Sequence, residues 1–183
     1  MSENCIVDFA SPTLAGIKTG SLFFASYNDM EECTSFLRNL NSSLVCKGIK
    51  ILPLKIANGR VMLYCYRPDA LKRDLERPEA KAILKGAGYK STNIPDCIFE
   101  LRKRIQEGSE FPHEIGLFLG YPPYDVKCFI ENRNDEVKCI GCWKVYGNRK
   151  KAEETFEKYR RCTACYKERL KNGATVEELA VAL

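Results

Sequence analysis

The sequence predicts an α+β fold, a small and mainly antiparallel sheet packed on several helices. Two observations lead to this prediction: a hairpin signal around Asn58-Gly59, and apolar residues that recur at helical spacing in most other segments. Strands come early, helices follow, and one late strand precedes the last helices, an order typical of α+β proteins. With 183 residues, 45% apolar and 29% charged, the chain is expected to form one domain, 1–183.

The first elements are a short helix, a strand and an amphipathic helix. We expect the short helix over Cys5–Phe9 and the strand over Ser21–Ser26, after two glycines. Asn28 or Asp29 is a suitable N-cap for the second helix, which Gly48 ends. The apolar side chains of this helix recur at spacings of three and four and form one buried stripe. They are Met30, Cys33, Phe36, Leu37, Leu40 and Leu44.

A β-hairpin over about 49–67 is the clearest local prediction. Asn-Gly supplies the two positive φ angles of a type I′ turn, and an apolar run lies on each side of it. In the second run, the residues that face either side of the strand are apolar. This strand is therefore expected to be central and covered on both faces. Pro53 cannot donate to a ladder, which places the first strand at an edge or a bulge.

The remaining chain predicts helices and one late strand. Pro68 begins a helical region that extends to about Lys85, and Asn93 caps another helix that ends at Gly108. The other expected elements are short helices over 112–119 and 123–132, the late strand over about 137–146, a long helix over 149–171 and a last helix over 176–183.

Composition excludes several classes of protein. No uncharged apolar run approaches the roughly 20 residues of a membrane span, and the polar, acidic start does not resemble a signal peptide. We therefore expect a cytoplasmic protein with no membrane partner. The ten cysteines are then expected to be thiols, because disulfide scaffolds belong to oxidising compartments.

His113 is the single histidine, so sites that need two histidines are excluded. Phosphate-binding loops and the Gly-x-Ser-x-Gly nucleophile motif are also absent from the sequence. Pro112 suits the first position of a helix, which places His113 and Glu114 in its first turn. These two residues, with a thiol as partner, are the candidate catalytic group if the protein is an enzyme.

Two Cys-x-x-Cys pairs match the spacing of a zinc template. The first pair, Cys139 and Cys142, lies in the expected late strand, where residues three apart face opposite sides. The second pair, Cys162 and Cys165, lies within the long helix beside its apolar stripe. We therefore predict packed thiols rather than a shared zinc site, with zinc and a redox dithiol as alternatives, and we expect no cofactor.

The long helix is basic, and it offers a nucleic-acid surface as another hypothesis. It carries nine Lys and Arg residues, but acidic residues alternate with them at pairing distance. The isoelectric point of about 8.6 is below the value above about 9 that is typical of dedicated nucleic-acid binders. A solvated helix face is therefore the preferred interpretation.

Three blocks rich in glycine, proline and aromatic residues stand out. They are Pro12–Phe23, His113–Val126 and Trp143–Gly147, the last followed by the helix that reaches Cys162. Together they resemble a family of short, uncharacterised proteins from anaerobic bacteria, known only as a domain of unknown function. The resemblance implies a bacterial cytosolic protein of about this length, and it implies no activity.

The polar and aromatic members of these blocks are the candidate binding residues, because lysines would supply charge and the rings a stacking surface. Together they predict a non-catalytic binding or regulatory module for a small, anionic ligand or a protein partner. An enzyme that uses His113 and Glu114, and a Cys-rich metal- or nucleic-acid-binding module, are the alternatives. The binding residues are Lys18, His113, Tyr121, Asp125, Lys127, Trp143, Lys144 and Tyr146.

Overall fold

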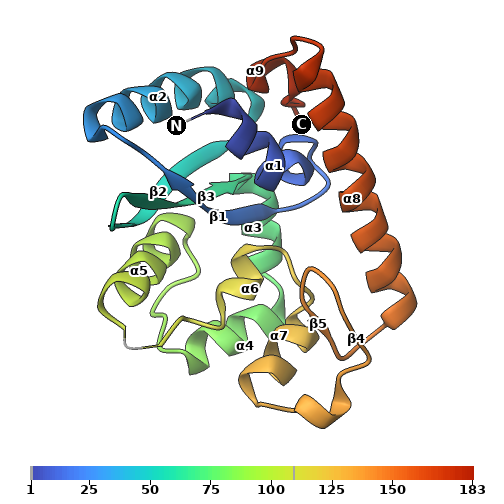
Figure 1. The fold of residues 1–183 in the computed structure, drawn as a ribbon. Coiled ribbons are helices and arrows are strands. Elements are labelled where there is room, and N and C mark those ends of the chain that lie inside the picture. The colour runs from blue at the N-terminus through green and yellow to red at the C-terminus, as the bar shows by residue number, and fades with distance from the viewer. Residues whose placement is uncertain (1, 109) are drawn as a thin grey trace. The chain divides into compact units, whose positions relative to one another are not determined.

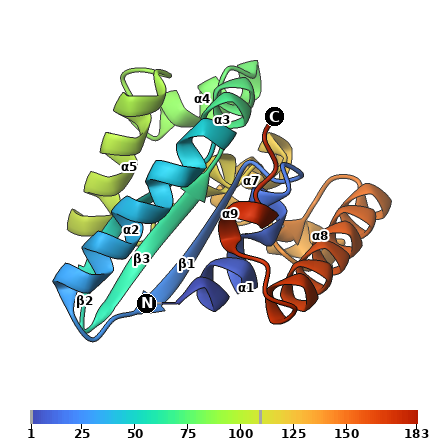
Figure 2. The ribbon, with the colours of Figure 1, turned by 90° about the horizontal axis from the view of Figure 1, so that it is seen from above.

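The computed structural model describes residues 2–108 and 110–183 (Figures 1 and 2). The chain divides into two compact units. The first comprises Met1–Asp69 and Tyr159–Leu183, and the second comprises Ala70–Lys158. This division into compact units does not test the prediction of one domain over 1–183, which stays a prediction.

The first unit contains a three-stranded antiparallel sheet in the order β1-β3-β2. The strands are β1 (Gly20–Ser26), β2 (Lys50–Ala57) and β3 (Arg60–Tyr66). Since β2 and β3 form the expected hairpin and β3 is the middle strand, both parts of the hairpin prediction are confirmed, and so is the α+β class. Figure 2 shows β1 and β3 side by side.

Local backbone chemistry explains the register of this hairpin. Asn58 and Gly59 have φ angles of 52° and 70°, as a type I′ turn requires. The register between β2 and β3 shifts between Pro53 and Lys55. The shift lies on an edge strand, where a residue without an N–H is tolerated.

Helices and the C-terminal segment build a core on one face of this sheet. Val61, Leu63 and Cys65 of β3 are each at most 1% exposed and pack with buried side chains of the helices. The elements of this unit are α1 (Glu3–Leu14), α2 (Met30–Leu44), a 3₁₀ turn η1 (Val45–Lys47), the end of α8 (Arg149–Lys171) and α9 (Val176–Leu179). The first helix is longer than the expected Cys5–Phe9 at both ends, and it includes Pro12 in its last turn.

The second unit is built of short helices and a small hairpin. The helices are α3 (Pro68–Leu75, which begins in the first unit), α4 (Pro78–Gly86), α5 (Ile94–Glu107), α6 (Ile115–Phe118), α7 (Pro123–Ile130), the 3₁₀ turn η2 (Asn134–Glu136) and the first turns of α8. The hairpin joins β4 (Cys139–Ile140) to β5 (Lys144–Val145).

Two segments of this unit differ from the expected elements. The single helical region over 68–85 is two helices, because Pro78 forces Arg77 to a ψ of 137°. The single late strand over about 137–146 is two strands of two residues with a turn over 141–143. Gly141 lies in this turn, and a Cβ there would overlap the ring of Phe156.

Among the described residues, no helix is both long enough and apolar enough to span a membrane.

Candidate functional site

A small cavity of about 360 Å³ in the second unit is lined mainly by aromatic rings. The rings come from three places: the segment before α6, the loop between α6 and α7 together with α7, and the turn just before β5. The aromatic lining residues are Phe111, His113, Tyr121, Phe129 and Trp143. The remaining wall consists of Ile115, Gly116, Asp125, Val126 and Lys144.

The corner between α6 and α7 explains how Tyr121 reaches this cavity. Gly120 ends α6 with a φ of 78°, and Pro122 and Pro123 set the start of α7. Gly116 leaves room for the tyrosine ring, since a Cβ on this glycine would lie 3.2 Å from Tyr121 Cδ2. The glycines and prolines of this block therefore shape the wall of the cavity.

Asp125 joins α7 to the segment around β5 that carries Trp143. Its carboxylate is 3% exposed and accepts three hydrogen bonds. Trp143 Nε1 donates to Oδ2 at 2.8 Å, and the backbone N–H groups of Tyr146 and Gly147 donate to Oδ1 at 3.0 and 2.8 Å. Buried carboxylates are stable only with such partners, so Asp125 fixes the indole rather than offering a free charge to the cavity.

The rings of the cavity pack against one another in defined geometries. Trp143 stacks on Tyr121 with centroids 4.8 Å apart and meets Phe156 edge-on at 4.6 Å. His113 meets Phe129 edge-on at 4.9 Å. These contacts fix the orientation of the rings in the cavity wall.

Lys144 supplies a positive charge at this aromatic wall. Its Nζ donates to Asn134 Oδ1 at 3.1 Å and lies 5.4 Å from the centre of the Phe129 ring. Within the described part of the chain, no carboxylate lies within 4 Å of this ammonium. The charge is therefore available to an anionic group that enters the cavity.

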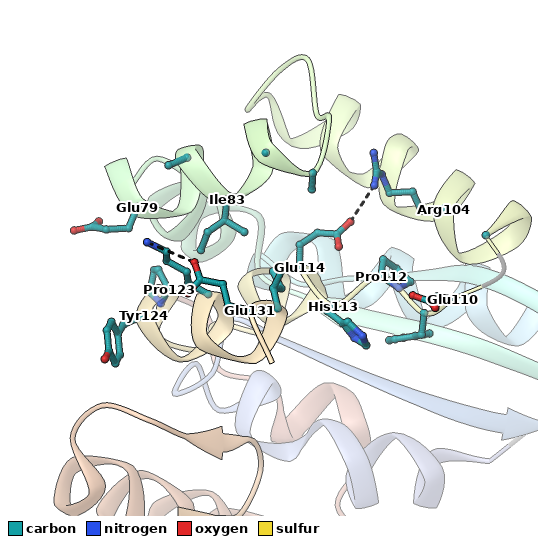
Figure 3. A pocket seen from close by; sticks show the side chains of 17 residues that line it. Glu79, Ile83, Arg104, Glu110, Pro112, His113, Glu114, Pro123, Tyr124 and Glu131 are labelled. Carbon is teal, nitrogen blue, oxygen red and sulfur yellow. Dashed lines mark ion pairs between the residues drawn. The ribbon is translucent and has the colours of Figure 1, made fainter. Parts of the chain in front are cut away.

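A second, larger cavity of about 930 Å³ lies beside α4, α7 and the residues before α6 (Figure 3). Phe111 and His113 line both cavities. Lys127 lines the larger one and pairs with Glu131 at 3.8 Å, and Glu114 lines it from a nearly buried position. The two cavities therefore share one wall.

Glu114 is held by partners other than His113. Its Oε1 accepts a hydrogen bond from the Tyr89 hydroxyl at 3.1 Å and lies 3.7 Å from Arg104 Nη1. Burial and the neighbouring Glu114 carboxylate raise the pKa of the Tyr89 hydroxyl well above its ordinary value, so this hydroxyl stays a donor at neutral pH. Figure 3 shows the Glu114 side chain directed to Arg104 and the His113 side chain directed away from it.

The sequence predicted that His113 and Glu114 lie in the first turn of a helix, and this prediction is wrong. Helix α6 begins at Ile115 and has four residues, so both side chains precede it. Among the described residues, the His113 side chain has no hydrogen bond to a thiol or a carboxylate. The structure thus places the His113 ring in the wall of the small cavity and the Glu114 carboxylate in an ion pair with Arg104.

Five of the eight predicted binding residues line the small cavity together. The other three lie elsewhere. Lys127 lines the larger cavity, and Tyr146 is 2% exposed with a hydroxyl that has no hydrogen-bond partner among the described residues. Lys18 belongs to the first unit, where its Nζ lies 5.7 Å from the centre of the Tyr159 ring. The five are His113, Tyr121, Asp125, Trp143 and Lys144.

The cysteine pairs differ from each other in their local structure. Cys139 begins β4 and Cys142 lies in the hairpin turn, so the argument from opposite faces of a strand does not apply to them. Cys162 and Cys165 lie on α8 in the first unit. The described residues include no group of three or more His, Cys, Asp or Glu side chains that could hold a metal ion. Packed thiols without zinc stay a prediction.

Sequence reasoning missed Phe111 and Phe129 in the small cavity, and Arg104 and Glu79 in the larger one. A signal for Phe129 was available, because it follows Asp125 by four residues and therefore shares a face of α7. Glu79 and Arg104 come from helices that are distant in sequence, and only the tertiary packing of α4 and α5 shows that they line a cavity.

The comparisons with known proteins identify a family but no function. A family model with the description "Protein of unknown function (DUF3793)" matches residues 6–180. No curated protein and no solved structure matches the chain.

Proposed function

Since the chain belongs to the family described as "Protein of unknown function (DUF3793)", whose description names no activity, we propose a function from the site itself. The protein is a binding module for a small, flat aromatic ligand that carries an anionic group. The ligand occupies the small cavity, with its ring between the aromatic walls and its anionic group at Lys144.

One observation carries this proposal: five aromatic side chains and an ammonium without a carboxylate partner among the described residues surround one cavity of about 360 Å³. Ligand sites commonly have volumes of about 300–1,000 Å³, so this cavity suits a ligand of one or two fused rings. Ring stacking contributes affinity, and the unpaired Lys144 charge adds selectivity for an anion.

Asp125 also lies in the wall, and its charge opposes an anion near it. Its two oxygens are occupied by three N–H donors, which compensate the carboxylate locally. Lys144 is therefore the group that favours one orientation of the ligand, with the anionic end at its ammonium.

Calorimetric titration with a matched pair of probes tests the proposal. Naphthoate carries a flat ring system and a carboxylate, and naphthylmethanol has the same rings without the charge. We expect wild-type protein to bind naphthoate about tenfold more tightly than naphthylmethanol, a difference of about 1.4 kcal/mol.

The variant K144M removes the charge and keeps an apolar side chain of similar length. It should abolish the preference for naphthoate and leave the affinity for naphthylmethanol unchanged. K103M is the matched control, because Lys103 is exposed on α5 and lines neither cavity. The proposal fails if neither probe binds at millimolar concentration, or if the preference for naphthoate survives in K144M.

A further inference from the structure

The larger cavity has an apolar wall that the proposed aromatic site does not use. This part of the wall consists of Ala82 and Ile83 of α4, Pro112, and Pro123 of α7. Figure 3 shows Ile83 and Pro123 on one side of the pocket and Pro112 on the other. The volume of about 930 Å³ is at the upper end of the range for small-ligand sites, so the cavity has room for an aliphatic group.

Large apolar side chains are exposed around this cavity. Phe111, Tyr124 and Ile130 line it, and they are 44%, 53% and 38% exposed. Contact between such side chains and water is unfavourable, and burial of their apolar surface is the main source of binding free energy. Exposed apolar side chains that gather around one concave surface therefore indicate a place that an apolar group covers.

The buried charge of this cavity is already compensated. Glu114 pairs with Arg104 at 3.7 Å, and Glu131 pairs with Arg133 at 2.7 Å and with Lys127 at 3.8 Å. The other charged residues of the lining are exposed, so water solvates them: Glu79 and Glu110. The pairing of Glu114 and the solvation of the exposed charges favour a neutral, apolar occupant over an ionic one.

Two residues connect the larger cavity with the small aromatic one. Phe111 and His113 line both cavities, and both residues are exposed. A ligand whose ring lies in the small cavity can therefore extend a substituent past these two side chains into the larger cavity. Lys144 lines the small cavity and not the larger one, so the anionic group of such a ligand stays in the small cavity.

We propose that the two cavities form one bipartite site, and that its ligand is an anionic aromatic compound with an aliphatic side chain. This inference rests on the function proposed above and narrows the class of ligand. The ring and the anionic group occupy the small cavity, and the aliphatic chain lies on the apolar wall of the larger one. Each methylene buried there removes apolar surface of both the ligand and the protein from water.

Calorimetric titration with an alkylated probe tests the proposal. In 6-butyl-2-naphthoate, a chain of four carbons is attached at the far side of the ring system from the carboxylate, and 2-naphthoate is the same compound without the chain. Full burial of one methylene corresponds to an affinity gain of about fourfold. Because the lining side chains are partly exposed and burial of the chain is incomplete, we expect a total gain of about thirtyfold.

Variants of the larger cavity locate the aliphatic chain. I83N places an amide in the apolar wall and should reduce the gain from the butyl chain at least about fivefold. Its affinity for 2-naphthoate should be unchanged, because Ile83 does not line the small cavity. I56N is the matched control, because Ile56 is exposed on β2 in the first unit and lines neither cavity, and it should leave both affinities unchanged.

A82W is a second variant that tests the same wall by bulk. Ala82 is exposed on α4, so the indole fills part of the larger cavity without entering the core, and it should also reduce the gain at least about fivefold. If I83N does not fold, as circular dichroism would show, A82W decides.

The proposal is overturned if the butyl chain raises the affinity by less than about threefold, or if either folded variant, I83N or A82W, keeps the full gain. Binding of 2-naphthoate that depends on Lys144, with no gain from the butyl chain, overturns the bipartite site and leaves the proposed function intact. A gain that I83N removes, with equal affinities of wild type and K144M, supports the bipartite site and contradicts the proposed role of Lys144. Absence of binding by either compound at millimolar concentration overturns both proposals.

Discussion

The replacement D125N tests whether the buried Asp125 carboxylate holds the site together. The amide oxygen of asparagine can still accept the two backbone N–H groups that now bond to Oδ1. Its NH₂ group then faces the indole N–H that now donates to Oδ2, so two donors oppose each other at a residue that is 3% exposed. An amide flip does not help, because it turns the NH₂ group toward both backbone donors.

The expected loss follows from these contacts. One hydrogen bond to a charged acceptor is worth about 1.5–3 kcal/mol, and an unpaired buried donor adds a further cost. We therefore expect D125N to lower the free energy of unfolding by about 2–4 kcal/mol. D135N is the matched control, because Asp135 is exposed in η2, and it should change this free energy by less than about 0.5 kcal/mol.

Urea unfolding measures this effect, followed by circular dichroism and by fluorescence of Trp143, the single tryptophan of the chain. A double-mutant cycle with W143F isolates the bond between Asp125 and the indole, because phenylalanine keeps an aromatic ring and removes the N–H donor. We expect D125N to cost at least about 1 kcal/mol less in the W143F background. Additive losses within about 0.3 kcal/mol would refute the assigned bond.

Three further predictions concern the stability of both units and are measured by urea unfolding. Arg67 is 3% exposed and donates to four backbone carbonyls, so R67M should cost about 3–5 kcal/mol, and a loss below about 1 kcal/mol would contradict this role. A Cβ at Gly141 overlaps the Phe156 ring, so G141A should cost about 1–3 kcal/mol and change Trp143 emission; unchanged emission would speak against the close packing. Burial raises the pKa of the Cys65 thiol from 9.0 to about 12, so folded protein keeps a proton that the unfolded chain releases. Stability should therefore fall from about pH 9 upward by about 1.4 kcal/mol per pH unit from this thiol, and C65A should show a slope smaller by that amount.

Local chemistry decided which parts of the fold could be predicted. Asn58-Gly59 encodes its turn in two residues, and Asp29 caps the following helix by accepting from the Glu32 N–H, so both elements agree with the sequence-based expectation. The prediction of one late strand was wrong, because an apolar run does not show where the chain turns back on itself. Gly141 was the available signal, since the packing of Phe156 against this position requires a residue without a Cβ.

The small cavity could be predicted in part because its members cluster in two glycine- and proline-rich blocks. His113, Tyr121 and Asp125 come from one block, and Trp143 and Lys144 come from the other. Their types, rings beside a lysine, already favoured a small, anionic ligand or a protein partner. The two blocks meet where the Trp143 indole and the backbone N–H groups of Tyr146 and Gly147 donate to the Asp125 carboxylate, and such a tertiary contact leaves no periodic pattern in the sequence.

The larger cavity could not be predicted, because its charged lining residues come from four separate segments. Glu79, Arg104, Glu114 and Glu131 are ordinary surface residue types in sequence. Only the burial of Glu114 and its pairing with Tyr89 and Arg104 distinguish it from a solvated glutamate. Burial of a single charged residue depends on packing between elements, which composition and spacing do not report.

The signal of the Trp143 indole N–H in a ¹H–¹⁵N correlation spectrum tests the central claim most directly. The chain has one tryptophan, whose ring lines the small cavity, so the spectrum contains one indole N–H signal that belongs to the site. On titration with naphthoate, we expect this signal to shift in proportion to the bound fraction, with a smaller shift in K144M at the same concentration. Binding of naphthoate with an unmoved indole signal would contradict the assignment of this cavity as the ligand site.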